Sequence, residues 1–280
     1  MTNKSKTSPK LSPKTVAILG LGKIGTILLQ AMLREGLLSA KRVRATVTRP
    51  EKAEALSKEL GIQVGTDNAA AVRGADIVLL AVKPQTVGAV LTGLRDILKE
   101  NQLLISVAAS VPTIYMEERL AAKVPIIRAM PNTPSMLGAG MSGICKGSNA
   151  TAAHLELAQA MFNTVGRTAV VEEKHMDAVT GLSASGPAFI YIIIESLAEA
   201  GVKVGLPRDL ATLLAAQTTM GAAKVVLETG QHPAQLKDAV TTPAGCTIDG
   251  ILELEEGKLR VTLIKAVVKA AQRAKELVFS

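Results

Sequence analysis

The sequence predicts an α/β N-terminal domain, built as a doubly wound and mainly parallel sheet, followed by an all-α C-terminal domain. In the first half of the 280 residues, short apolar runs alternate with amphipathic segments of helical length. A glycine-rich turn joins the first apolar run to the first amphipathic segment. Beyond residue 172 the strand-like runs stop and long helical periods follow. These features are typical of a Rossmann domain joined to a helical domain.

The elements of the first domain follow from the positions of the apolar runs. Strands are expected at residues 16–20, 43–47, 77–82, 103–107 and 126–130. Amphipathic periods predict crossover helices between them at residues 24–35, 51–60, 86–99 and 114–122. Two further runs, at residues 141–145 and 168–171, are expected to be edge strands. We therefore place a domain at residues 15–172, preceded by a disordered basic tail at residues 1–14.

The second domain, at residues 173–280, is predicted to be entirely helical. Helices are expected at residues 187–204, 208–228, 233–240, 246–255 and 260–277. Between residues 211 and 227 the only charged side chain is Lys224. A helix that is apolar on every side must be covered on every side. We expect a partner subunit to cover it in a homodimer, with a higher oligomer left open; a place in the core of one subunit is the alternative.

Composition limits the partners of the chain. Aromatic residues make up 2% of the sequence and Trp is absent, so stacking on nucleic acid is not expected. Four lysines lie in the first 14 residues, and removing them from the net charge of +8 leaves +4. No uncharged stretch is long enough to predict a membrane segment. Cys145 and Cys246 form no redox or metal motif, which fits reduced thiols in the cytoplasm.

A dinucleotide site is predicted at the glycine-rich turn Gly20-Leu21-Gly22-Lys23-Ile24-Gly25, which follows the first strand and opens a helix. Gly20 permits the tight turn, Gly22 lets the backbone approach a pyrophosphate, and Gly25 lets the helix pack closely on the strand. Free amides at the helix start bind the anion.

The second strand favours NADPH as the cofactor, with NADH as a weaker alternative. A carboxylate about 20 residues beyond the glycines would bind the ribose of NAD, but no acid lies there. The strand instead leads into Thr48 and Arg49, and a guanidinium suits a 2′-phosphate. Residues Ala81, Val82, Lys83 and Pro84 lie at the C-terminal end of a later strand, where the ribose and nicotinamide are expected.

Four segments carry a resemblance to a known family: AVKPQ (81–85), MPNTP (130–134), SASGPAF (183–189) and TTPAGCT (241–247). Together they resemble pyrroline-5-carboxylate reductase, over about residues 16–277. The resemblance implies reduction of 1-pyrroline-5-carboxylate to proline with NAD(P)H, the last step of proline biosynthesis. It also implies helices that interlock in a dimer.

The resemblance also implies roles for individual residues. Cofactor contacts are expected at Gly20, Leu21, Gly22, Lys23, Ile24, Arg49, Asn68, Ala81, Val82, Lys83, Pro84 and Ala108, to which the second strand adds Thr48. Substrate contacts are expected at Thr242, Gly245, Cys246 and Thr247, with Thr247 as the catalytic residue. The sequence departs from the common family pattern at Ser110, Ala184 and Ala244, which puts loop geometry in question because alanine does not easily adopt positive φ.

The segment 241–247 offers what reduction of a cyclic imine requires. A helix that starts near Gly245 would hold the substrate carboxylate on its free amides, and the Thr242 hydroxyl adds a hydrogen bond. Thr247 would orient and polarise the ring nitrogen, although helix capping is its other possible role. Cys246 is interpreted as a small packing residue. The histidines His154, His175 and His232 lack ligand spacing, so no metal is expected.

Two other functions stay open on the sequence. One is a 3-hydroxyacid-type NADP dehydrogenase, which needs an acid/base on the helical domain; Lys174 and Lys203 are the candidates, and neither has a suitable setting. The other is a sensor that binds NADPH without turnover. Asp177 has no predicted role beyond a solvated charge, and Asn132 is expected to order the turn between the two halves.

Overall fold

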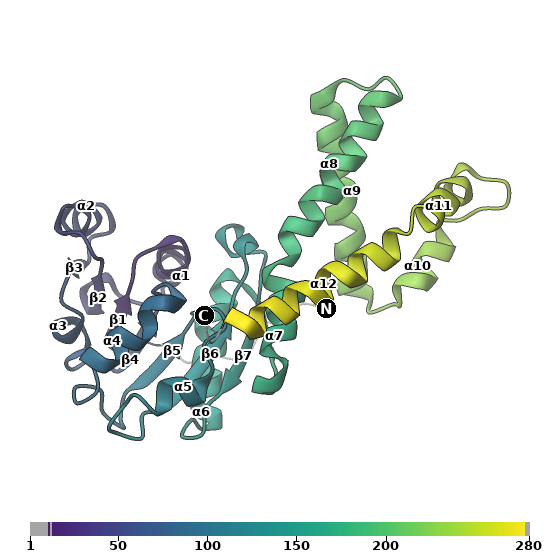
Figure 1. Cartoon of the computed structure of the whole chain (residues 1–280). Helices are drawn as coiled ribbons and strands as arrows, with labels where there is room; N and C mark the ends of the chain where they lie inside the picture. The colour runs from purple at the N-terminus through teal and green to yellow at the C-terminus, as the bar shows by residue number, and fades with distance from the viewer. Residues whose placement is uncertain (1–10, 12, 278–280) are drawn as a thin grey trace. The chain divides into compact units, whose positions relative to one another are not determined.

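Figure 1 shows the computed structural model of the chain, which describes residues 11 and 13–277. The chain forms two compact units. The first runs to Ala184 and also takes in the end of the last helix from Ala270, and the second is Ser185–Lys269. Most of the expected tail, residues 1–10 and 12, lies outside the described residues. The domain boundary at residues 172 and 173 stays a prediction.

The first unit is built on one sheet of eight strands. They are β1 Val16–Leu19, β2 Val43–Thr46, β3 Gln63–Gly65, β4 Ile77–Leu80, β5 Leu103–Ser106, β6 Ile126–Met130, β7 Gly140–Lys146 and β8 Gly166–Val170. Their order in the sheet is β3-β2-β1-β4-β5-β6-β7-β8, and every neighbouring pair is parallel except β6 and β7. The strand order reverses between β1 and β4, and ligands of such sheets bind outside the strand ends at this point. The predicted doubly wound sheet is confirmed.

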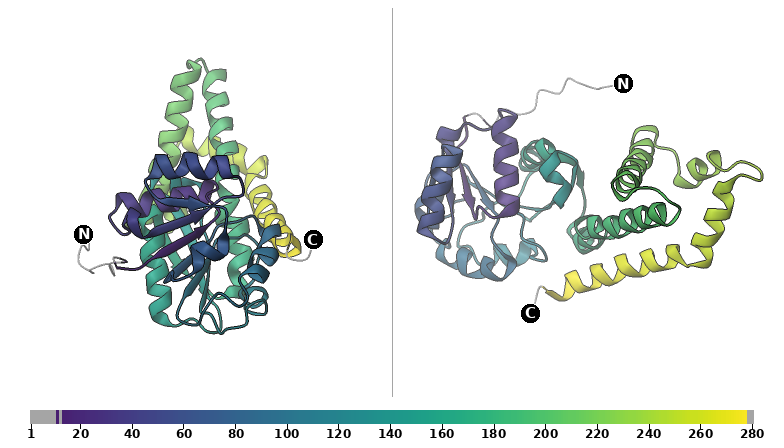
Figure 2. Two further views of the ribbon diagram at one scale, coloured as in Figure 1. Left: turned by 90° about the vertical axis from the view of Figure 1, so that its left-hand side faces the viewer. Right: turned by 90° about the horizontal axis from the view of Figure 1, so that it is seen from above.

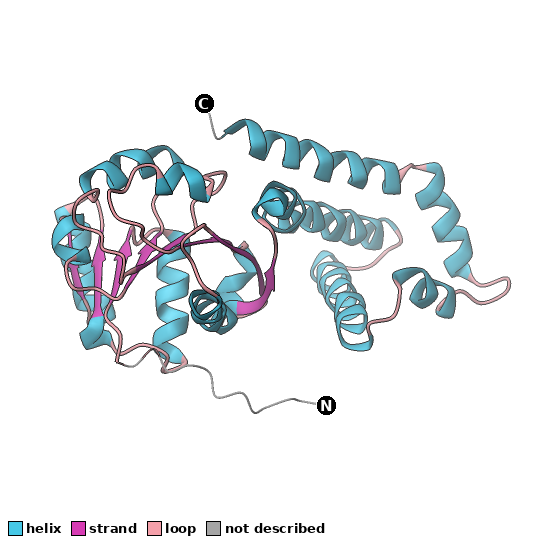
Figure 3. Cartoon of the chain, turned by 90° about the horizontal axis from the view of Figure 1, so that it is seen from below, coloured by secondary structure: helices cyan, strands magenta, loops and turns pink. Residues whose placement is uncertain are grey.

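Helices cover both faces of this sheet (Figures 2 and 3). One face packs against α1 Lys23–Arg34, α2 Pro50–Leu60 and α6 Ala152–Phe162. The other face packs against α3 Asn68–Val72, α4 Val87–Gly93 and α5 Thr113–Glu117. Successive residues of β1 point to opposite faces, and all four are fully buried. The sheet therefore has a hydrophobic core on each side.

Three expectations about these elements were wrong in detail. The run at residues 141–145 is not an edge strand, because β7 lies between β6 and β8. The helix expected at 86–99 begins as a 3₁₀ turn and ends at Gly93. The helix expected at 114–122 ends at Glu117, after which the amides of Arg119 and Leu120 donate three residues back, to the carbonyls of Met116 (3.2 Å) and Glu117 (3.3 Å).

Among the elements that were missed are one strand and two helices of the sheet domain. Strand β3 has only three residues and lies at the edge of the sheet. Helix α3 is short, but its start carries a recognisable signal: the Asp67 carboxylate accepts from the amides of Ala69 (2.8 Å) and Ala70 (3.1 Å). Helix α6 begins after Thr151, whose amide donates to His154 Nδ1 (3.1 Å), a variant of the capping box with His in place of Glu or Gln.

The helices expected in the C-terminal half are confirmed within two residues at each end. They are α8 Gly186–Lys203, α9 Arg208–Thr229, α10 Pro233–Ala239, α11 Cys246–Glu256 and α12 Leu259–Glu276, the last of which ends in the first unit. Before them, α7 Met176–Val179 continues into a π-helical turn at Thr180–Ala184.

The second unit has a very small core of its own. Its buried cluster consists of Ala198, Ala211 and Ala215, where α8 and α9 pack against each other. Gly201 permits this approach, since a Cβ there would lie 2.9 Å from the Ala211 side chain. Large apolar side chains on α8 and α9 are exposed instead, including Ile192, Leu213 and Met220. This unit therefore needs a further apolar surface to cover it.

By length and composition alone, two helical stretches could cross a membrane, Glu173–Lys203 and Arg208–Thr229. Only 11% of each apolar window is buried within the chain. Helices that pack between subunits meet the same test, because they too are apolar on most sides.

Candidate functional site

The glycine-rich turn between β1 and α1 has the geometry of a dinucleotide cradle. Gly20 adopts φ +97°, and a Cβ there would lie 2.8 Å from the Ala81 carbonyl oxygen. A Cβ on Gly25 would lie 2.3 Å from the Gly20 carbonyl oxygen, so this position too requires glycine. A Cβ on Gly22 would meet nothing within 4 Å. Gly22 therefore leaves open space directly at the N-cap of α1, where a pyrophosphate fits.

Thr46, at the end of β2, connects the turn to Asn68. Its carbonyl oxygen accepts the amides of Gly20 (3.1 Å) and Leu21 (3.2 Å). Its hydroxyl donates to Asn68 Oδ1 at 2.6 Å, which leaves the Asn68 amide group free to donate elsewhere. Sequence reasoning missed Thr46, which is only 3% exposed. Its position as the last residue of β2, beside the glycine-rich turn, is the sequence feature that could have identified it.

The residues after β2 place cations beside the same turn. Thr48 and Arg49 are exposed, and Arg49 is the N-cap of α2. Lys52, one turn further on, donates from Nζ to the Leu21 carbonyl oxygen at 3.1 Å. Sequence reasoning missed Lys52, because spacing alone cannot show which lysine of a helix turns toward a neighbouring loop. The end of β2 thus carries hydroxyl, guanidinium and ammonium groups.

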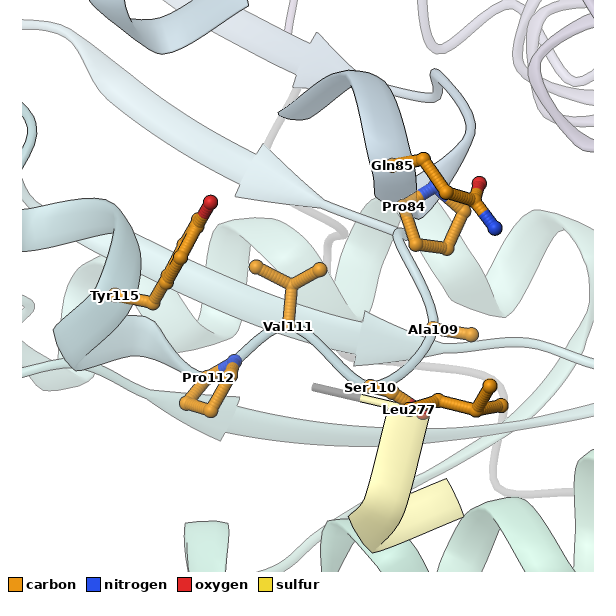
Figure 4. Close-up of a pocket in the computed structure, with 8 residues that line it drawn as sticks. All are labelled: Pro84, Gln85, Ala109, Ser110, Val111, Pro112, Tyr115 and Leu277. Atoms are coloured by element: carbon orange, nitrogen blue, oxygen red, sulfur yellow. The ribbon is translucent and has the colours of Figure 1, made fainter. Parts of the chain in front are cut away.

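The carboxyl ends of β4 and β5 lie next in the sheet. Ala81 and Val82 are half-buried, Lys83 is exposed, and Pro84 starts a 3₁₀ turn. Ala108 is buried. Beside them a cavity of about 220 Å³ is lined by Pro84, Gln85, Ala109, Ser110, Val111, Pro112, Tyr115 and Leu277 (Figure 4).

Ser110 and Ala244, two of the three departures from the family pattern, both adopt the left-handed conformation, with φ of +59° and +56°. The concern about loop geometry at these two positions is therefore confirmed, since both residues carry a side chain where glycine fits best. The Ser110 hydroxyl is also buried and has no hydrogen-bond partner among residues 11 and 13–277. Ala184, the third departure, lies in the π-helical turn.

Asn132 orders the turn after β6, as expected. Its side-chain oxygen accepts the amide of Met141 at 2.9 Å, and its amide group donates to the Ser183 carbonyl at 3.2 Å. The second bond reaches the π-helical turn Thr180–Ala184, which directly precedes the N-cap of α8. Asn132 thereby joins two of the segments that carry the family resemblance.

A buried charged group that sequence reasoning missed lies nearby, on β6. Arg128 is 4% exposed and forms ion pairs with Glu173 (3.4 Å) and Asp177 (3.7 Å). The Glu173 carboxylate also accepts the Thr113 amide at 2.7 Å. Asp177 is thus not simply a solvated charge. Burial, with a smaller contribution from Glu173, raises the pKa of the neighbouring Cys145 thiol to about 12, so this cysteine stays protonated and unreactive.

The segment before α11 forms a tight turn with a free helix start. The Gly245 amide donates to the Thr242 carbonyl (3.0 Å), with Pro243 second and Ala244 third in the turn, the pattern of type II. A Cβ on Gly245 would lie 2.4 Å from the Thr242 hydroxyl, so only glycine fits beneath it. Gly245 is the N-cap of α11.

The candidate substrate residues therefore gather at one helix start. Cys246 and Thr247 are the first two residues of α11, and their amides have no partner inside the helix. Thr247 is half-buried, while Thr242 and Cys246 are exposed. These residues belong to the second unit, and the dinucleotide residues belong to the first. Within the described residues, no group of three or more His, Cys, Asp or Glu could hold a metal ion.

The sheet order, the glycine cradle and the cations after β2 place the chain among the Rossmann-type, NADP-dependent oxidoreductases. Residues 15–110 match the family described as NADP oxidoreductase coenzyme F420-dependent. Residues 173–277 match the family described as pyrroline-5-carboxylate reductase dimerisation. The chain belongs to the pyrroline-5-carboxylate reductase family.

Relatives that match nearly the whole chain support its membership of this family. It is 45% identical to a pyrroline-5-carboxylate reductase of Methanosarcina acetivorans, over 94% of this chain and 97% of the relative. It is 43% identical to a pyrroline-5-carboxylate reductase of Glycine max, over 94% of this chain and 96% of the relative. Among solved structures, a pyrroline-5-carboxylate reductase of Coxiella burnetii superposes with a TM-score of 0.89 at 36% identity. The match covers 95% of this chain and 99% of that one. The Plasmodium falciparum pyrroline carboxylate reductase with NADP bound has a TM-score of 0.85 at 30% identity. That match covers 95% of this chain and 98% of the other.

Proposed function

We propose that the chain reduces 1-pyrroline-5-carboxylate to L-proline with NADPH, the last step of proline biosynthesis. The observation that carries the proposal is identity of up to 45% over almost the full length of relatives named pyrroline-5-carboxylate reductase. The TTPAGCT turn supports it independently, because its helix start offers the chemistry that a small cyclic imino acid requires. We further propose a homodimer in the cytoplasm that uses no metal and binds neither nucleic acid nor membrane.

The proposed cofactor site is the cradle at the switch point of the sheet. The pyrophosphate is held by the free amides of Gly22, Lys23 and Ile24, and Gly20 and Leu21 form the rest of the turn. Thr48 and Arg49 take the adenosine end, and Asn68 donates to it with an amide group that Thr46 orients. The backbone of residues 81–84 and the small side chain of Ala108 leave room for the nicotinamide ribose. Bound NADPH supplies the hydride.

The proposed substrate site is the start of α11. The amides of Cys246 and Thr247 and the positive end of the helix dipole hold the carboxylate, and the Thr242 hydroxyl adds a hydrogen bond. The Thr247 hydroxyl hydrogen-bonds the ring nitrogen and fixes the ring. The imine carbon accepts the hydride, and the nitrogen carries a proton taken from solvent. Catalysis here rests on proximity and orientation, because a threonine hydroxyl is a weak acid.

The dehydrogenase alternative finds no suitable acid/base in the described residues. Lys174 is exposed and pairs with Glu172 at 2.6 Å, and Lys203 is the exposed last residue of α8. General acid/base chemistry needs a lysine whose pKa is lowered by burial or by a neighbouring cation. The sensor alternative differs from the main proposal only in turnover, so it is separated by experiment.

The test is oxidation of NADPH by the purified protein in the presence of 1-pyrroline-5-carboxylate, followed at 340 nm, with proline identified as product. Thr247→Ala should lower kcat/KM by about 10-fold, the scale of one lost transition-state hydrogen bond. Thr247→Ser retains the hydroxyl and should stay within about 3-fold of wild type. NADPH binding without turnover would support the sensor, and turnover of hydroxy acids alone would support the dehydrogenase.

A further inference from the structure

Lys52 is a cation that reaches the dinucleotide cradle from helix α2. Its ammonium donates to the Leu21 carbonyl oxygen at 3.1 Å, in the middle of the glycine-rich turn. The Leu21 amide bonds in turn to the Thr46 carbonyl oxygen at 3.2 Å, at the end of β2. The ammonium is therefore held at a turn whose own backbone is bonded to the end of β2. In Rossmann domains, the ribose 2′ position lies at this strand end.

The charge of Lys52 is not compensated by a carboxylate. Among residues 11 and 13–277, neither Lys52 nor Arg49 forms an ion pair, whereas the buried Arg128 is paired with two acids. Glu51 is the one acid in the first turn of α2 and pairs with neither cation. With two cations and one acid, this helix start carries a net charge of +1. An ammonium has three donors, and the described part of the chain occupies one of them.

We propose that Lys52 determines cofactor specificity: together with Arg49, its ammonium binds the 2′-phosphate of NADPH. This inference rests on the proposed function and adds a residue to it. NADPH and NADH differ only by that phosphate. A cation that binds the phosphate therefore raises affinity for NADPH and leaves affinity for NADH unchanged.

A purely structural role for Lys52 makes a different prediction. If the ammonium serves only to hold the Leu21 carbonyl, its removal disturbs the pyrophosphate cradle that both cofactors share. NADPH and NADH would then lose affinity by the same factor. The ratio of the two dissociation constants separates these roles, and it needs no turnover.

The experiment compares Lys52→Met with wild type in titrations of NADPH and NADH. Methionine keeps an unbranched apolar stem and removes the charge. The fluorescence of the reduced nicotinamide reports binding directly, and the chain has no Trp that could transfer energy to it. We expect the Kd for NADPH to rise by about 5-fold or more and that for NADH to change by less than about 2-fold. Ionic strength is fixed, because surface charges are screened by salt.

Lys58→Met is the matched control. Lys58 is an exposed lysine of the same helix, six positions further on, so its loss changes the net charge equally. It should leave both dissociation constants unchanged. In competition with NADPH, adenosine 2′,5′-bisphosphate should lose affinity for Lys52→Met while adenosine 5′-monophosphate does not. The inference is overturned by an equal loss for both cofactors, by no loss for NADPH, or by the same loss in Lys58→Met. A wild-type protein without turnover would refute the proposed function and leave this result standing.

Discussion

Ser110 and Ala244 are side chains in a conformation that favours glycine, with φ of +59° and +56°. An L-residue with a Cβ pays roughly 1–2 kcal/mol in this region. Ala244 lies in the turn before α11 and Ser110 in the loop after β5, so both strained residues flank proposed binding segments. Strain of this kind persists when the surrounding structure fixes the backbone, and it is concentrated at functional sites.

Ser110 makes this strain measurable. Ser110→Gly removes the left-handed penalty and a buried hydroxyl without a partner, at the cost of greater backbone entropy in the unfolded chain. We expect the free energy of unfolding in urea to rise by about 1 kcal/mol. Ser110→Ala removes the hydroxyl but keeps the strained Cβ, so it should stabilise less than Ser110→Gly. A Ser110→Gly variant less stable than Ser110→Ala would show that the backbone at residue 110 is not strained, because only the entropy cost of glycine would then remain.

At the scale of elements, Thr46 couples three of them: β2, the turn into α1, and α3. Thr46→Val keeps the shape and removes the hydroxyl that orients Asn68, while its carbonyl still holds the glycine turn. Loss of one hydrogen bond should raise the Kd for NADPH by about 5-fold. Thr46→Ser keeps the donor and should bind nearly as wild type.

A double-mutant cycle tests whether Thr46 acts through Asn68. If it does, Thr46→Val should have little further effect in an Asn68→Ala background. Additive losses in the double variant would mean that the two residues act separately.

Regular elements with long periods were predictable, and elements defined by local side-chain bonds were not. The strands β1, β2, β4, β5 and β6 and the helices of the second unit follow apolar patterning, which burial enforces along the whole element. The end of α5 was not predictable, since no glycine or proline marks the point where the amides switch to carbonyls three residues back. Asp67 is a recognisable N-cap residue for α3, but this helix has only five residues, too few for an apolar period to show in the sequence.

The same distinction holds for the candidate site. Glycine positions and the TTPAGCT turn are visible in sequence because backbone geometry demands specific residue types. Three residues that the sequence did not reveal act through partners 22 to 49 positions away: Thr46, Lys52 and Arg128. No spacing rule encodes such pairs. Asn132 was predictable as a turn residue, but its bond to Ser183 was not.

At the scale of the whole molecule, the second unit exposes more apolar surface than a separate folded unit normally does. Leu213 is 64% exposed and Met220 57% exposed on α9, although the helix is apolar on most sides. The buried cluster of this unit consists of three alanines, too few to stabilise five helices. A second copy of the chain would bury these faces, in keeping with the dimerisation family that residues 173–277 match.

Dimerisation through α9 predicts that a charge at Leu213 separates the subunits. Wild type should elute in size-exclusion chromatography with light scattering at twice 29.2 kDa or a higher multiple. Leu213→Glu should shift mass toward the monomer, because burying an unpaired carboxylate in an apolar interface is costly. Gln63→Glu, the same change of charge at an exposed position of β3, should leave the assembly intact.

A variant that unfolds instead of dissociating would still be informative, because the wild type offers a second measurement. Folding that depends on a partner makes the thermal midpoint rise with protein concentration. We therefore expect the midpoint of wild type to increase over a hundredfold range of concentration, and that of Leu213→Glu to be lower and independent of it. A wild-type chain that is monomeric, with a midpoint unaffected by concentration, would mean that the exposed faces of α8 and α9 serve another purpose.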